Sequence, residues 1–198
     1  FIVGHSMGGL ISTYALHLNS LRPPKTRLHF DGLILSSPWL RLADDDLQVQ
    51  ALPIVPDVVK FLAHILPKLV FHPGKPASGL SHDPIVIQHY ANDPLNCAST
   101  GVRARTFVEV NRIQDLLHES AYKKVSSYVP AMLIMHGEKD IYANTKGSKD
   151  FFTMIDSRDK ELKIYKNYYH EIFNEQVDPS SGKIKPLMKL KSWLKARL

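Results

Sequence analysis

The chain has 198 residues, with 25 Lys and Arg against 19 Asp and Glu, so its formal charge is +6. Apolar residues make up 44% and charged residues 22%, which is ordinary globular composition and excludes a disordered tail. The most apolar stretch, residues 54–71, predicts no transmembrane helix because four polar side chains interrupt it: Asp57, Lys60, His64 and Lys68. The single cysteine, Cys97, excludes an intrachain disulfide and favours a reducing, cytoplasmic compartment.

Short apolar runs alternate with helical patterns along the chain. The first run ends at Val3, before Gly4, and apolar side chains then recur at helical spacing over residues 10–18. Continuous apolar runs predict three further strands, the last shorter and more exposed than the others: residues 32–36, 131–136 and 162–165. Strands buried on both faces with helices between them are typical of parallel sheets, so we expect a doubly wound α/β fold.

A long segment without a convincing strand separates the second predicted strand from the third. An ordinary parallel crossover needs only about a dozen residues, so we expect an inserted helical subdomain. The predicted division is a core over residues 1–38, a helical cap over 39–118, and the core again over 119–198. Helical patterns inside this insertion cover residues 58–71, 84–90 and 101–118.

The helix predicted over residues 58–71 is apolar nearly all round. That composition suits a tunnel for a lipid chain or a lid that faces a membrane surface. A plain core helix of the cap fits the same composition, so both alternatives stay open.

The last 16 residues carry six Lys and Arg and no acid, whereas the rest of the chain is balanced. Apolar residues recur at helical spacing between these lysines, ending with Trp193 and Leu194. This pattern predicts an amphipathic closing helix with a solvated basic face. No signature with interleaved aromatic residues is present, so we expect no nucleic-acid partner.

A candidate catalytic motif lies where the first predicted strand meets the first helix. Residues 4–8 read Gly-His-Ser-Met-Gly, a G-x-S-x-G pentapeptide. In such a sharp turn, Gly4 and Gly8 are expected to avoid side-chain clashes while the Ser6 hydroxyl stands above the sheet edge. The backbone N–H of Met7 then becomes an oxyanion donor.

A serine hydroxyl is a poor nucleophile without a base and an orienting acid. Acid and base are expected in that order, each after the carboxyl end of a strand. Glu138 and Asp140 follow the third predicted strand, and His170 follows the fourth. We favour Asp140 because Glu138 lies nearer the strand end, where the turn itself is expected.

Other reactive side chains have simpler interpretations. His5 is expected to pack beside the serine with its side chain pointing away, and His136 to be a satisfied core residue. Cys97 is interpreted as buried filler. No zinc-ligand spacing is present, so we expect no metal and no organic cofactor, although an ion at residues 44–46 stays an alternative.

Several blocks together resemble one enzyme group: GHSMGG, LILSSP, YANDPL, MLIMHGEKD and LKIYKNYYHEIFNE. They are similar to the monoacylglycerol lipase and lysophospholipase group of the α/β-hydrolase superfamily. The resemblance implies Ser6 as nucleophile, Asp140 as acid and His170 as base, with a cap that shapes an acyl-chain pocket. Members of the group have four strands and a His-Gly oxyanion loop before the elbow. These elements are absent from this chain, which begins with Phe1. We therefore expect the chain to be the C-terminal part of a longer enzyme, and to be inactive and poorly soluble when it is produced alone.

The expected function is therefore a serine hydrolase that cleaves carboxylic esters of single-chain lipids, monoacylglycerol or lysophospholipid, through an acyl-enzyme. The expected location is cytoplasmic and peripheral at membranes, with transient membrane contact through the cap. A short-chain carboxylesterase, a serine peptidase of the same fold, and a non-catalytic binding module are the alternatives.

Overall fold

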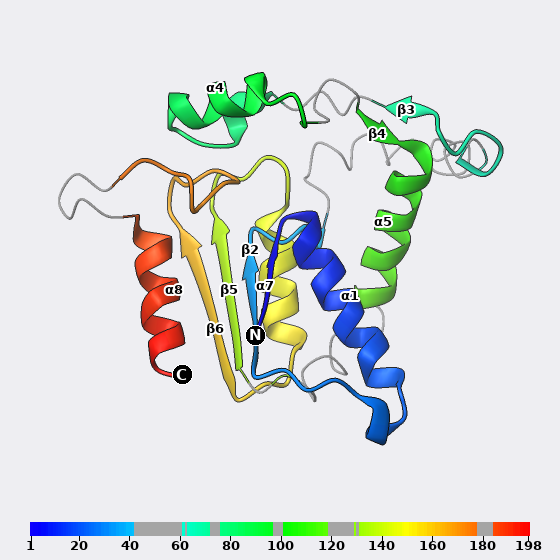
Figure 1. Cartoon of the computed structure of the whole chain (residues 1–198), viewed down its shortest axis with the longest axis vertical. Coiled ribbons are helices and arrows are strands. Elements are labelled where there is room, and N and C mark those ends of the chain that lie inside the picture. Colours follow the sequence, from blue (N-terminus) through cyan, green and yellow to red (C-terminus); the bar gives the residue numbers. More distant parts are fainter. Residues whose placement is uncertain are drawn as a thin grey trace.

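A computed structural model describes residues 1–41, 61, 63–71, 76–96, 101–118, 129, 131–177 and 184–198. Four parallel strands form one sheet in the order β1-β2-β5-β6 (Figure 1). Their bounds are β1 Ile2–His5, β2 Gly32–Ser36, β5 Ala131–Gly137 and β6 Asp159–Tyr165. The parallel α/β fold expected from the sequence is confirmed.

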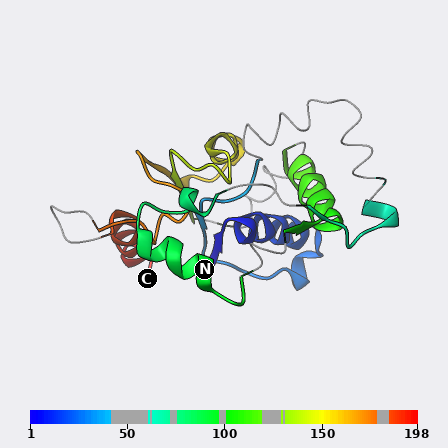
Figure 2. The same cartoon turned by 90° about the horizontal axis from the view of Figure 1, so that it is seen from above.

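Helices cover both faces of this sheet (Figures 1 and 2). The helices α1 (Met7–Leu21) and α7 (Thr145–Met154) pack on one face, and α8 (Lys185–Lys195) packs on the other. Near the carboxyl ends of the strands lie α4 (Pro84–Asn92) and the short turn η2 (Ala77–Gly79), whereas α5 (Ala104–Leu116) lies beside α1. A further turn, η1 (Pro24–Thr26), follows α1.

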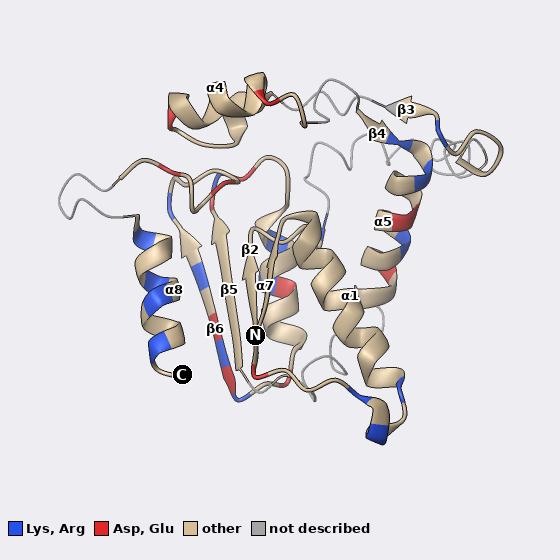
Figure 3. Ribbon diagram, viewed as in Figure 1, with Lys and Arg blue, Asp and Glu red and all other residues tan. Residues whose placement is uncertain are grey.

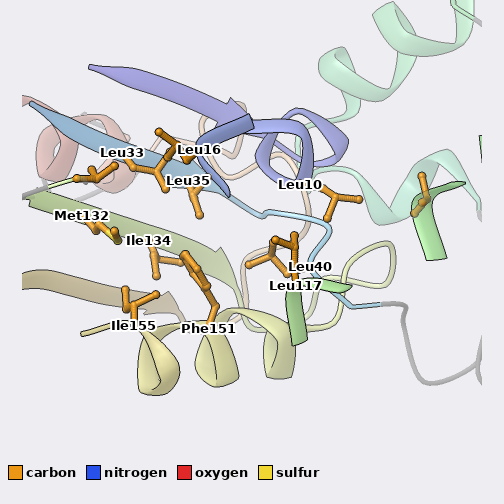
Figure 4. Close-up of a cluster of buried hydrophobic side chains, with 12 residues drawn as sticks. Leu10, Leu16, Leu33, Leu35, Leu40, Leu117, Met132, Ile134, Phe151 and Ile155 are labelled. Carbon is orange, nitrogen blue, oxygen red and sulfur yellow. The ribbon is translucent and has the colours of Figure 1, made fainter. Parts of the chain in front are cut away.

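The two central strands are buried along their whole length, as their continuous apolar runs predict. Alternate side chains of β2 and β5 point to opposite faces. On one face, Leu33 and Ile134 pack with Leu10 of α1 and Phe151 of α7 (Figure 4). On the other face, a second cluster packs against Trp193 of α8. The sheet therefore has a separate core on each side.

The fourth strand is longer than the sequence indicates. The sequence predicts a short strand over residues 162–165, but β6 pairs with β5 from Asp159 to Tyr165. Its first residues are charged, which hides them from a hydrophobic pattern. Those charges are satisfied at the sheet edge: Lys160 donates to the backbone oxygens of Phe152 and Ile155, and Asp159 accepts from Arg197.

The inserted segment contains a small antiparallel ladder that the helical patterns did not predict. Strand β3 (Val70–Phe71) pairs with β4 (Val102–Arg103). A continuous helix over 58–71 is therefore wrong at its end, where Pro67 favours a break. The helix expected from 101 begins only at Ala104. Residues 58–60 and 62 lie outside the described residues, and the division into core and cap stays a prediction.

The closing helix α8 has the predicted amphipathic character. Trp193 is buried, while Lys185, Lys191 and Lys195 are exposed, and basic residues recur along the helix (Figure 3). Part of this basic surface is neutralised, because Lys189 pairs with Glu161 and Arg197 with Asp159 of β6. None of the helices in the described residues has the length and hydrophobicity that a membrane crossing needs.

Candidate active site

The turn between β1 and α1 holds Ser6 in a conformation that is rare for residues other than glycine. Its φ is 53°, in the left-handed region. Four backbone hydrogen bonds fix it. The Ser6 N–H donates to the Ser36 oxygen at 3.0 Å. The Ser6 oxygen accepts from the N–H groups of Gly9 at 3.0 Å, Trp39 at 2.9 Å and Leu10 at 3.4 Å. The strain of such a conformation persists only where surrounding contacts over-determine it.

The glycines around Ser6 have different roles. A Cβ at Gly4 would lie 2.7 Å from the backbone oxygen of Gly8, and one at Gly9 would lie 2.6 Å from Cβ of Pro38. A Cβ at Gly8 meets nothing within 4 Å among the described residues. The prediction that Gly8 avoids a side-chain clash is therefore wrong among the described residues. The tight positions are Gly4 and Gly9, which pack against neighbouring backbone and Pro38.

The structure brings the three predicted site residues into one hydrogen-bonded row. His170 Nε2 lies 2.9 Å from Ser6 Oγ, and His170 Nδ1 lies 2.6 Å from Asp140 Oδ2. A carboxylate only accepts, so Nδ1 carries a proton and Nε2 is free to accept from the serine hydroxyl. The three residues follow β1, β5 and β6, whose carboxyl ends share one edge of the sheet (Figure 1).

The Asp140 carboxylate is fully buried and accepts several hydrogen bonds. The backbone N–H groups of Tyr142 and Ala143 donate to Oδ1 at 2.7 and 2.9 Å, and His136 Nε2 lies 3.0 Å from Oδ2. Burial alone would raise the pKa of Asp140, but the hydrogen bonds from His136 and His170 hold it well below its usual range. The acid is therefore ionised while it faces His170.

Glu138, the competing acid, lies elsewhere. Its carboxylate accepts a hydrogen bond from the backbone of Asn167 at 3.2 Å, on the exposed side of the loop. The two acids therefore differ in position, because of the two it is Asp140 that contacts the His170 ring.

The ring of His170 lies between two other rings. Those of His5 and Tyr142 have centroids 5.0 and 5.1 Å away. His5 Nε2 lies 3.1 Å from Glu171 Oε1. Burial lowers the pKa of His5, but the hydrogen bond and charge of Glu171 outweigh it and raise the pKa above its ordinary value. Burial raises the pKa of Glu171, and its bond to His5 gives a net lowering.

The backbone of the histidine loop is also anchored. Ser37, with a positive φ of 42°, donates through its hydroxyl to the His170 oxygen at 2.7 Å. The Glu171 N–H donates to the Leu80 oxygen at 2.8 Å, which ties the loop to the segment before α4. Sequence reasoning missed these contacts, because they join residues far apart in the chain.

Met7 is the first residue of α1, so the helix itself offers its N–H no acceptor. No acid occurs in the first turn of α1 to compete for this donor. In the described part of the chain, no group of three His, Cys, Asp or Glu side chains has an arrangement that could hold a metal ion. Residues 44–46 and Cys97 lie outside the described residues.

Comparisons with known proteins give a consistent family. The model of the family described as "Serine aminopeptidase, S33" matches residues 1–177. The human protein named monoglyceride lipase is 32% identical over 176 residues, covering 88% of this chain and 52% of its own length. The chain spans between 52% and 59% of the length of that protein and of the yeast, mycobacterial and rat relatives named monoglyceride or monoacylglycerol lipase.

Two solved structures show the same fold. A monoacylglycerol lipase of Paleococcus ferrophilus superposes with a TM-score of 0.78 at 24% identity, covering 99% of this chain and 68% of its own. A soluble variant of the Saccharomyces cerevisiae monoglyceride lipase, in complex with a substrate analogue, gives 0.74 at 25% identity and covers 100% of this chain and 61% of its own.

Proposed function

Since this chain belongs to the serine aminopeptidase S33 family and has the α/β-hydrolase fold, we propose that it carries the catalytic residues of a serine hydrolase acting on single-chain lipid esters. The observation that carries this proposal is the hydrogen-bonded arrangement of Ser6, His170 and Asp140. The ester substrate is supported by relatives named monoglyceride lipase, one of them solved with a substrate analogue.

In the proposed reaction, His170 Nε2 removes the proton of Ser6 as Oγ attacks the ester carbonyl. The Met7 N–H stabilises the oxyanion, together with a second donor from outside the described residues. His170 then gives its proton to the leaving alcohol, and an acyl-enzyme forms. Water hydrolyses that ester by the same proton transfers in reverse. Asp140 keeps the imidazole in the tautomer that can accept from serine, and no cofactor or metal is required.

We also propose that the cap contacts the lipid. Phe61, Ile65, Leu66 and Leu69 are exposed apolar side chains in the described part of the segment 58–71. Exposed apolar side chains suit contact with an acyl chain or a membrane surface better than the interior of a helical cap. The membrane contact would be transient, from a reducing, cytoplasmic side.

A substrate panel tests the proposed function in the full-length protein. We expect faster hydrolysis of long-chain monoacylglycerol or lysophospholipid than of triacylglycerol, with turnover reduced at least about a thousandfold by Ser6→Ala. Activity on acetate esters alone would indicate a general esterase. Cleavage of N-terminal peptide bonds would favour the peptidase that the family description names. No Ser6-dependent turnover on any of these would favour a binding module.

A further inference from the structure

The same oxygen of Asp140 contacts two imidazoles. Oδ2 lies 2.6 Å from His170 Nδ1 and 3.0 Å from His136 Nε2. The side chains of His136 and Asp140 are both fully buried. A serine–histidine–acid mechanism needs one imidazole on the acid. The proposed function above gives His136 no part, so this second contact requires its own explanation.

The partners of His136 determine where its proton lies. Nε2 faces two acceptors, Asp140 Oδ2 and the Ala143 oxygen at 3.1 Å, so this nitrogen must carry hydrogen. Nδ1 lies 2.7 Å from the hydroxyl of Ser148, a buried residue of α7. A hydroxyl can donate to Nδ1 of a neutral ring. The hydrogen bonds then run in one direction, from Ser148 to His136 to Asp140.

We propose that His136, held by Ser148, is a positioning residue that orients the Asp140 carboxylate and takes up part of its charge. The backbone donors of Tyr142 and Ala143 hold Oδ1, and the two imidazoles hold Oδ2. Both carboxylate oxygens are therefore held by hydrogen bonds from the protein. This role rests on the proposed function for its catalytic meaning, but its effect on His170 is measurable without turnover.

The charge that Asp140 presents to His170 sets how basic that imidazole is. An N–H donated to the carboxylate stabilises the negative charge and weakens its attraction for a second proton donor. Removing the donor of His136 should therefore raise the pKa of His170. Four other groups face the His170 ring: Ser6, Tyr142, His5 and the Glu171 paired with it.

Two substitutions separate the hydrogen bond from the volume of the side chain. His136→Leu removes the donor, and we expect the pKa of His170 to rise. kcat/KM on a soluble ester should fall about tenfold. His136→Gln should restore most of both, because its amide offers two N–H groups where the structure has two acceptors.

One further variant tests the hydrogen bond from Ser148 to His136, and another is a control for packing. Ser148→Ala should shift the pKa of His170 in the same direction by a smaller amount, since the ring keeps its Nε2 donor but loses its anchor. Phe151→Leu removes buried packing from the same helix without touching these hydrogen bonds. We expect it to lower the melting temperature and to leave the His170 titration unchanged.

The measurements are NMR titration of histidine ring nitrogens and the acid limb of kcat/KM against pH, both in the full-length protein. The proposal is supported if the pKa of His170 rises in His136→Leu, returns toward the wild-type value in His136→Gln, and does not change in Phe151→Leu. An unshifted His170 in His136→Leu, or an equal shift in Phe151→Leu, overturns it. If His136→Leu fails to fold, His136→Asn takes its place, because its amide is too short to reach Asp140. Absence of ester turnover in the wild type would reject the proposed function, while the NMR titration still decides the role of His136.

Discussion

Among single residues, His5 and Glu171 form an ion pair beside the His170 ring. Glu171 raises the pKa of His5 above its ordinary 6.5, although burial opposes it. The stability from this pair is therefore complete below the unfolded pKa of His5 and falls as pH rises through the folded one. The pKa of Glu171 is lowered, so the stabilisation that its negative charge contributes is lost in acid, as pH falls below about 4.5.

Glu171→Gln is expected to lower the pKa of His5, because the neutral amide no longer stabilises the imidazolium. Histidine NMR titration in the full-length protein measures this directly. Asn174→Ala is the matched control, since it removes the other hydrogen bond on Glu171 and leaves the His5 contact in place. An unchanged His5 titration in Glu171→Gln would show that Glu171 does not determine the charge of the His5 imidazole.

Asp140→Asn is expected to reduce kcat by about four orders of magnitude. The amide cannot stabilise an imidazolium, and its NH2 would face some of the donors that now meet the carboxylate. Steady-state turnover of a soluble ester measures the loss. Glu138→Gln is the control, because the Glu138 carboxylate accepts from the exposed backbone N–H of Asn167. Comparable losses in both variants would make the assignment of Asp140 wrong.

At the scale of elements, the elbow between β1 and α1 depends on close backbone approach. Gly4→Ala and Gly9→Ala place a Cβ within 2.7 Å of neighbouring atoms, whereas Gly8→Ala meets open space among the described residues. We expect the first two to cost about 1–3 kcal/mol of folding free energy and Gly8→Ala to cost less. Thermal melts compare them, and equal melting temperatures in all three would contradict this packing.

Strands β2 and β5 could be predicted because burial on both faces leaves a continuous apolar run in the sequence. The start of β6 could not, since its charges are satisfied at an edge by Arg197 and by backbone oxygens. The two-residue strands β3 and β4 are too short to show a period.

The same contrast holds for the candidate site. Ser6, Asp140 and His170 could be predicted because each follows a recognisable strand, and parallel strands bring their carboxyl ends together. The contacts of His136 with Ser148 and of Ser37 with His170 depend on how α7 and the loops pack. No local pattern in the sequence encodes such packing.

At the scale of the whole molecule, the outer edge of β1 has no strand partner in the described part of the chain. Val3 and Ile11 beside it are 60% and 54% exposed. Unpaired edges with apolar neighbours promote association. We therefore propose that residues 1–198, produced alone, associate in solution and hydrolyse esters poorly. Sedimentation velocity and an ester assay test this, and a monodisperse, active preparation would reject it.

In the proposed mechanism, His170 activates Ser6 as the nucleophile, and Asp140 orients the imidazole of His170. A fluorophosphonate probe measures this activation, because the probe forms a covalent adduct only with an activated serine. In the full-length protein, we predict one adduct, located by mass spectrometry on the peptide that contains Ser6, absent in Ser6→Ala and strongly slowed in Asp140→Asn. An adduct on another residue, or no adduct in the folded wild-type protein, would show that Ser6 is not the activated nucleophile.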